Sequence, residues 1–291
     1  MSTIHPTAII DSSANVAKTA VVGPYCVVGP DVTIGAGTVL HNHVVVHSLT
    51  TIGEDNEFFP FSVIGADPQD KKFRGERSTC EIGDRNQIRE HVTIHRGTEM
   101  GGNVTSVGSD NLIMVAAHIA HDCRLGDEIV IANQVMIAGH AVIESGASIG
   151  GGAGVHHFAT IGACAFVGGL ARINKDVPPF MLVEGNPAEV RSCNVIAMSR
   201  RGFSDAEIEA IKDAYKRLYR TNGSPMSEKL DDLRNEYVGN RAIEMLCDHL
   251  EASATGVHGR ALESSRLDRK WASRRPATAA AATAAAASVA D

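Results

Sequence analysis

Aliphatic side chains recur at every sixth residue along the first two thirds of the chain. From Ile4 to Ile64 every sixth position holds Ile, Leu or Val, except for Phe58, and the same period continues over residues 82–94 and 107–173. These 26 positions are called the register positions below. Helical burial recurs near 3.6 residues and strand burial near 2, so this period predicts short strands joined by regular corners.

A six-residue period is typical of a parallel β-helix, in which three short strands make one coil of about 18 residues. Side chains four residues after a register position are usually small, as at Ala14, Cys26 and Ala117, and fit where three walls converge. Glycine often follows a register position directly, and we expect it to supply the positive φ that corners need. The sequence therefore predicts a mainly β fold with a parallel β-helix over residues 1–190, and its spacing does not fix the handedness.

Two interruptions of the register predict loops that leave the stack. Residues 65–80 carry too many charges to continue a core, and residues 97–106 are rich in glycine. Loops on a rigid scaffold often carry function. The repeats are expected to end at DVPPF, residues 176–180, because its prolines cannot donate to a continuing ladder.

A different pattern follows, which predicts a small α-helical domain over residues 191–255. Ser204 and Glu207 form a capping-box signature at the start of one helix, and Gly223 is expected to stop it. Further helices are predicted near 227–238 and 240–253. Residues 256–291 are of low complexity and are expected to be disordered.

Composition narrows the class of protein. The net charge of −7 argues against general nucleic-acid binding. None of the six cysteines forms a CxxC pair, which favours a reducing compartment. No signal peptide and no apolar run long enough to span a membrane is present, so we expect a soluble, cytoplasmic protein.

Histidines gather at one corner of the predicted coil, because residues 18 apart should stack. One column would hold His121, Gly139 and His157, and the next Asp122, His140 and Phe158. His118 and His156 lie within three residues of these columns.

The cluster has the parts of a general acid–base site. A neutral His is a natural base near pH 7, a carboxylate can orient it, and the N–H of Gly139 could stabilise an oxyanion. Solvated corner histidines and a zinc site remain alternatives. Asp70 and Lys72, read alone, are solvated charges. Arg200 and Arg201 could serve only solubility, or, as a basic pair beside a helix start, could hold phosphate.

Several motifs together resemble one known family. In chain order they are the hexapeptide repeats, IGADPQDKKFRGE, IHRGT, VGSDNLIMVAAHIAHDC, AGH, GVHHF, DVPPF, GNPA and RRGFS. Over roughly residues 3–250 the chain is similar to the UDP-N-acetylglucosamine O-acyltransferases of lipid A biosynthesis. The resemblance implies a left-handed β-helix, a homotrimer with sites between subunits, (R)-3-hydroxyacyl-acyl carrier protein as donor, and neither cofactor nor metal.

The resemblance also implies roles for single residues. His121 would be the base that deprotonates the glucosamine 3-hydroxyl, Asp122 would orient it, and the Gly139 N–H would hold the oxyanion. The residues implied in substrate binding are Asp70 and Lys72 for the sugar nucleotide, His118, His140 and His156 along the site, Asn194, Arg200 and Arg201 near the nucleotide and phosphates, and Gly169, where side-chain size limits acyl-chain length.

The chain departs from the family pattern at His157, where the family usually has Gln in contact with the diphosphate, and in its alanine-rich tail. One rival is the N-acyltransferase of the same pathway, whose N-terminal domain is not expected here because the repeats begin at Ile4. Others are a zinc-dependent hydratase of similar architecture and a non-catalytic scaffold, which would leave the histidine cluster unexplained.

Overall fold

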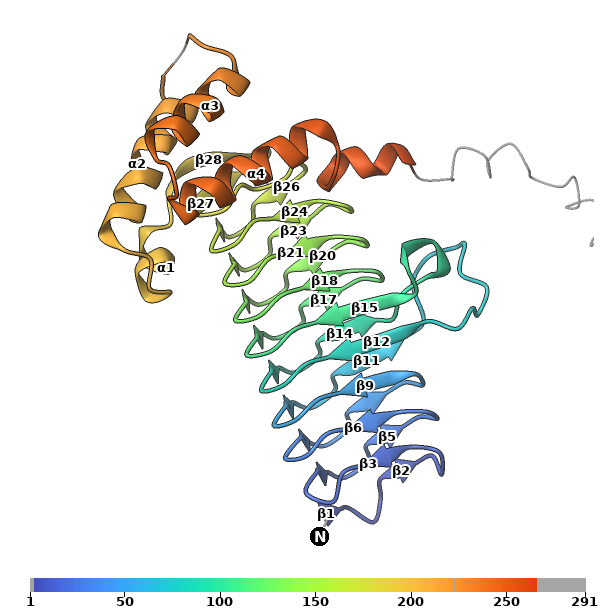
Figure 1. Ribbon diagram of the computed structural model, residues 1–291. Helices are drawn as coiled ribbons and strands as arrows, with labels where there is room; N and C mark the ends of the chain where they lie inside the picture. The colour runs from blue at the N-terminus through green and yellow to red at the C-terminus, as the bar shows by residue number, and fades with distance from the viewer. Residues whose placement is uncertain (1–2, 222, 266–291) are drawn as a thin grey trace, which may run out of the picture.

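The computed structural model describes residues 3–221 and 223–265, and a stack of triangular coils dominates it (Figure 1). Sheet A contains β1 (Thr3–Ile4), β4 (Val21–Val22), β7 (Val39–Leu40), β10 (Glu57–Phe58), β13 (Gln87–Ile88), β16 (Leu112–Ile113), β19 (Val130–Ile131), β22 (Ser148–Ile149), β25 (Phe166–Val167), β27 (Met181–Gly185) and β28 (Ala188–Cys193). Sheet B contains β2 (Ile9–Ile10), β5 (Val27–Val28), β8 (Val45–Val46), β11 (Val63–Ala66), β14 (Thr93–His95), β17 (His118–Ile119), β20 (Met136–Ile137), β23 (Gly154–Val155) and β26 (Arg172–Ile173). Sheet C contains β3 (Asn15–Val16), β6 (Thr33–Ile34), β9 (Thr50–Ile52), β12 (Thr79–Ile82), β15 (Val104–Val107), β18 (Arg124–Leu125), β21 (Val142–Ile143) and β24 (Thr160–Ile161).

The register positions coincide with the strands. Each of the 26 lies in one of β1 to β26, and each of these strands pairs in parallel with the strand three places along the chain. From Val22 onward all of them are buried, whereas Ile4 remains 43% exposed because no coil lies beneath it. The predicted parallel β-helix is therefore confirmed.

The corners use glycine differently from the prediction. Positive φ occurs three residues after a register position, and there the residue is usually not glycine, as at Asp31 (55°), Asp122 (62°) and His140 (62°). Glycine directly after a register position is needed for space instead. A Cβ added at Gly35 would lie 2.3 Å from the carbonyl oxygen of Gly53 in the next coil.

Both predicted loops leave the stack at the same corner. One connects β11 to β12 and the other connects β14 to β15, so each runs from sheet B to sheet C, one coil apart. The second contains the 3-10 helix η1 (Glu99–Gly101). Figure 1 shows the two loops projecting from one side of the coil. His121 follows β17 at this same corner, one coil later. The fold therefore brings both loops close to His121.

The prolines do not end the stack as predicted. Val177 bridges to Ile161, and β27 pairs in parallel with β25 and so adds a further strand to sheet A. Sheet A ends with β28, which runs antiparallel to β27. The prolines occupy the corner between Val177 and Met181, where a ladder N–H is not required.

In the part of the chain that the structure describes, four α-helices follow: α1 (Val195–Arg200), α2 (Asp205–Tyr219), α3 (Met226–Glu236) and α4 (Arg241–Thr255). The capping box of Ser204 and Glu207 is present as predicted, but α2 ends at Tyr219, before Gly223. The hydrophobic pattern did not predict α1. Among the helices that the structure describes, none is both long and apolar enough to span a membrane.

The start of the tail is ordered, contrary to prediction. Residues Gly259–Ser265 form a second 3-10 helix, η2, that continues from α4 across the coil (Figure 1). The rest of the predicted disordered tail, residues 266–291, lies outside the described residues.

Candidate active site

The two predicted columns lie side by side, in register. Hydrogen bonds run from the second column to the first: the N–H of His140 donates to the carbonyl of His121 over 3.0 Å, and the N–H of Phe158 donates to the carbonyl of Gly139 over 3.1 Å. Within β17 and β20, Ile119 lies opposite Ile137. Parallel pairing in register thus brings residues 18 apart into contact, coil over coil.

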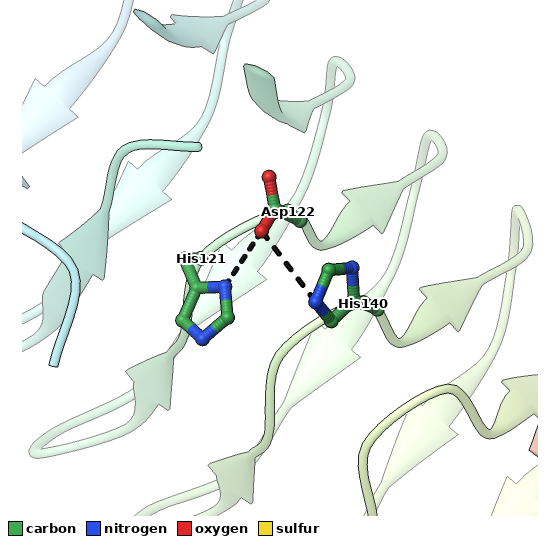
Figure 2. Close-up of side chains that lie close together, drawn as sticks. All are labelled: His121, Asp122 and His140. Carbon is green, nitrogen blue, oxygen red and sulfur yellow. Dashed lines mark hydrogen bonds and ion pairs between the residues drawn. The ribbon is translucent and has the colours of Figure 1, made fainter. Parts of the chain in front are cut away.

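His121 and Asp122 form a hydrogen-bonded pair at this corner. Nδ1 of His121 lies 2.6 Å from Oδ2 of Asp122, and Figure 2 shows the other ring nitrogen, Nε2, pointing away from the carboxylate. The Asp122 side chain is fully buried and that of His121 is 14% exposed. A buried carboxylate on Nδ1 fixes the tautomer and leaves Nε2 for a substrate proton.

The second loop closes over Asp122. The Thr98 N–H donates to Oδ1 and the Thr98 hydroxyl to Oδ2, each over 2.7 Å. The Asp122 N–H in turn donates to the Thr105 hydroxyl. Gly101 packs so tightly that an added Cβ would lie 1.9 Å from the carboxyl carbon of Asp122. This loop therefore supplies the hydrogen bonds that a buried charge needs.

Gly139 lies directly against the His121 ring. A Cβ at this position would lie 2.7 Å from Cε1 and 2.8 Å from Nε2 of His121. The Gly139 N–H has no hydrogen-bond acceptor among the described residues. An amide without an acceptor beside Nε2 is available to an anionic oxygen.

His140 completes the corner from the next coil. Its Nε2 lies 3.7 Å from Oδ2 of Asp122, an ion-pair distance beyond hydrogen-bond reach (Figure 2). Its ring stacks on that of Phe158 with centroids 4.4 Å apart. Both the stacking and the nearby carboxylate therefore hold the His140 ring at this corner.

Burial disfavours the charged form of three neighbouring histidines. Burial lowers the pKa of His95 to about 4, with His118 and His121 adding to the effect. Burial, followed by the proximity of His121, also lowers the pKa of His118, whose Nδ1 lies 2.7 Å from the Thr93 hydroxyl. Burial is likewise the main cause that lowers the pKa of His156. Sequence reasoning missed His95, although it stands in the IHRGT motif.

Two cavities meet at His121 and Gly139. One, of about 490 Å³, runs along the outside of sheet B, where Ala120, Met136 and Ala138 contribute apolar side chains. The other, of about 360 Å³, is polar and is lined by Gln69, Asp70, Lys71, His121, Ala138, Gly139, His140 and His157. The pair of histidine and glycine therefore stands between a space suited to a hydrocarbon chain and one suited to a polar group.

The first loop brings Asp70 and Lys72 to the polar side. The Lys72 N–H donates to Oδ1 of Asp70, and its ammonium lies 3.5 Å from Oδ2. Burial alone would raise the pKa of Asp70, but the Lys72 hydrogen bond and the charges of Lys72 and His121 lower it overall. Arg96 stabilises the first loop through an ion pair with Asp67, with nitrogen and oxygen 2.7 Å apart.

Other predicted residues do not reach His121 within one chain. Gly169 lies at the corner between sheets A and B, beside Gly151. Asn194 caps α1 and donates to the carbonyl of Cys164, at the corner between sheets C and A. Arg201 pairs with Glu128 at that same corner, and Arg200 lies exposed next to it.

Within residues 3–221 and 223–265, two groups of side chains could offer three metal donors each. They are His121, Asp122 and His140, and His156, His157 and Glu263, with the donor atoms of each group within 4.8 Å of one another. The Asp122 carboxylate already accepts three hydrogen bonds. Glu263 is shared between His157 and the guanidinium of Arg260, a cation that disfavours a second one. Hydrogen bonds and ion pairs account for both groups without a metal.

Comparison with known proteins decides the family. A family model described as UDP N-acetylglucosamine O-acyltransferase, domain 2, matches residues 176–258. The solved UDP-N-acetylglucosamine O-acyltransferase of Moraxella catarrhalis is 45% identical, with a TM-score of 0.83, over 86% of this chain and 97% of that one. The chain belongs to the UDP-N-acetylglucosamine O-acyltransferase family.

Further members of the UDP-N-acetylglucosamine O-acyltransferase family are similarly close. LpxA from Acinetobacter baumannii is 44% identical, covering 86% of this chain and 97% of its own, with a TM-score of 0.83. The Francisella novicida acyltransferase is 38% identical, covering 86% and 91%, with the same TM-score. The protein is therefore an acyltransferase with the left-handed parallel β-helix of this family, and the sequence resemblance is confirmed.

Proposed function

We propose that the protein transfers an (R)-3-hydroxyacyl chain from acyl carrier protein to the 3-hydroxyl of UDP-N-acetylglucosamine, the first step of lipid A biosynthesis, in the cytoplasm. Family membership supports a UDP-N-acetylglucosamine O-acyltransferase. The observation that carries the proposal is the meeting of an apolar and a polar cavity at His121 and Gly139, because the reaction joins a hydrocarbon chain to a sugar nucleotide at one point.

In the proposed mechanism His121 acts as general base. Its Nε2 removes the proton of the sugar 3-hydroxyl as that oxygen attacks the thioester carbonyl. The negative charge that develops on the carbonyl oxygen is stabilised by the Gly139 N–H. The tetrahedral intermediate then collapses, the carbon–sulfur bond breaks, and the imidazolium returns its proton to the departing carrier-protein thiolate.

Asp122 has the geometry to orient and stabilise that imidazolium. Its Oδ2 binds Nδ1, and the donors from Thr98 keep the buried carboxylate satisfied throughout. Asp70 and Lys72 would contact the sugar nucleotide on the polar side, which is supported by their lining of cavities there together with His140 or His157. His118 and His156 line the apolar cavity.

A homotrimer would unite the remaining residues. Gly169, Asn194, Arg200 and Arg201 lie at corners of the coil other than that of His121. Neighbouring subunits that turn these corners toward the corner of His121 would bring them to a shared substrate. Closed symmetry of this kind is common among soluble homo-oligomers.

A transfer assay tests the proposal. Purified protein is incubated with acyl carrier proteins bearing 3-hydroxyacyl chains of graded length, and with acceptors that carry either a 3-hydroxyl or a 3-amino group. We expect an ester product on UDP-N-acetylglucosamine, recognised by its hydrolysis in mild base. An amide product on the 3-amino acceptor alone would instead assign the protein an N-acyltransferase activity.

A further inference from the structure

Glu263 contacts the site from a segment beyond the matched family domain. The family model ends at residue 258, and η2 follows at Gly259–Ser265. Nε2 of His157 lies 2.6 Å from Oε1 of Glu263. A carboxylate 106 residues away in sequence thus holds one of the side chains that line the polar cavity.

The His157 ring is held on several sides. Its centroid lies 3.8 Å from that of His156 and 5.8 Å from that of Phe158, to which it is nearly perpendicular at 76°. Glu263 occupies Nε2, so Nδ1 is the ring nitrogen that can bond a ligand. The imidazole therefore has a defined orientation before any substrate arrives.

The segment that carries Glu263 has anchors of its own. Arg260 donates from Nη1 to the carbonyl of Asn174 over 3.1 Å, and Ser253, at the end of α4, donates to Oδ2 of Asp176 over 2.6 Å. Removing the carboxylate of Glu263 frees both His157 and the second guanidinium nitrogen of Arg260, but the bonds of Arg260 to Asn174 and of Ser253 to Asp176 remain and should keep η2 in place.

Glu263 is a charged acceptor at neutral pH. The hydrogen bond with His157 is the largest of the causes that lower the pKa of Glu263 to about 2, and Arg260 contributes further. Charge-assisted hydrogen bonds of this kind are stronger than neutral ones and fix geometry well.

We propose that Glu263 is a positioning residue for sugar-nucleotide binding, which holds the His157 imidazole in the orientation that contacts the ligand of the polar cavity. The inference rests on the proposed function, since it takes that ligand to be UDP-N-acetylglucosamine. A glutamine at position 157 carries a donor and an acceptor on one amide and needs no outside carboxylate. In this chain the carboxylate of Glu263 orients His157, and His157 then presents Nδ1 to the ligand.

A double-mutant cycle tests the pair. The full-length wild type is compared with Glu263→Ala, His157→Gln and the double variant for KM and kcat toward UDP-N-acetylglucosamine at saturating acyl donor, for Kd by calorimetry, and for Tm. We expect Glu263→Ala to raise KM and Kd about five- to tenfold, with kcat and Tm nearly unchanged. In the His157→Gln background the same substitution should change nothing.

Two further variants sharpen the result. Glu263→Gln keeps an acceptor oxygen for Nε2 and should recover most of the lost affinity. Glu251→Ala is the matched control. It removes a carboxylate of α4 that pairs with Arg234 of α3, and it should leave KM, kcat and Kd unchanged. Equal effects of Glu263→Ala in both backgrounds, or no effect in the wild-type background, would overturn the inference while wild-type transfer stands. A wild type that does not acylate UDP-N-acetylglucosamine would overturn the proposed function and the inference with it.

Discussion

Thr98 donates twice to the carboxylate of Asp122, through its N–H and through its hydroxyl, each over 2.7 Å. The contact spans 24 residues and joins a loop to the corner that carries His121. It is the reason that a fully buried carboxylate can remain beside His121 without a cation.

Replacing Thr98 by Val removes only the hydroxyl donor, because the backbone N–H remains. We expect kcat to fall about tenfold and the free energy of unfolding to fall by about 1–3 kcal/mol, the cost of losing a hydrogen bond to a charged group. Steady-state kinetics and urea denaturation measure the two effects. Thr51→Val, on the exposed side of β9, is the matched control and should alter neither. Full activity of Thr98→Val would show that the loop does not support Asp122.

Gly139→Ala should displace the His121 ring, since an added Cβ would come within 2.8 Å of Nε2. The expected loss of kcat is about a hundredfold or more, comparable with removal of an oxyanion donor. Gly151→Ala, at the same repeat position on another corner, meets only an ordinary 3.4 Å contact and should remain active. Similar activities of the two variants would argue against Gly139 as part of the site.

The coiled scaffold could be predicted from the sequence because the register positions are the positions that the fold buries. Every register position lies in a strand, and the stacking of His121, Gly139 and their neighbours followed from the coil length alone. The role of glycine after a register position was misjudged, because the close approach of the next coil is visible only in three dimensions.

The rest of the site depends on contacts between loops and the coil, which cannot be predicted from the spacing of residues along the sequence. Thr98 could have been suspected, since its loop begins at the corner that also carries His121. Glu263 could not, because a low-complexity segment gave no sign of docking. The handedness also came from resemblance rather than from the period.

Stability should depend on pH through His95. Its pKa in the folded state is about 4, whereas an unfolded histidine titrates near 6.5. The unfolded chain therefore takes up the proton first, so the contribution of His95 to stability is complete above about pH 6.5 and is lost as pH falls toward 4, at no more than about 1.4 kcal/mol per pH unit. Denaturation at several pH values should show a shallower slope for His95→Asn than for wild type. His5→Asn, at an exposed histidine, is the control, and identical slopes for all three proteins would contradict this account.

Gly169→Met tests whether sites form between subunits. Within one chain the position is exposed, and an added Cβ meets nothing closer than 3.4 Å, so folding should be unaffected. If a neighbouring subunit brings Gly169 to the acyl chain, the larger side chain should shift the preference to shorter chains. Competition among acyl carrier proteins of graded chain length measures the shift, and an unchanged preference would place the length limit elsewhere.

The most direct test of the account is the rate of acyl transfer by His121→Ala at saturating concentrations of both substrates. The side chain is partly exposed in a cavity rather than packed in the core, so Tm should be nearly unchanged. The account predicts that kcat falls by about a hundredfold to ten-thousandfold, as expected for loss of a general base. A folded variant that keeps most of the wild-type kcat would contradict it.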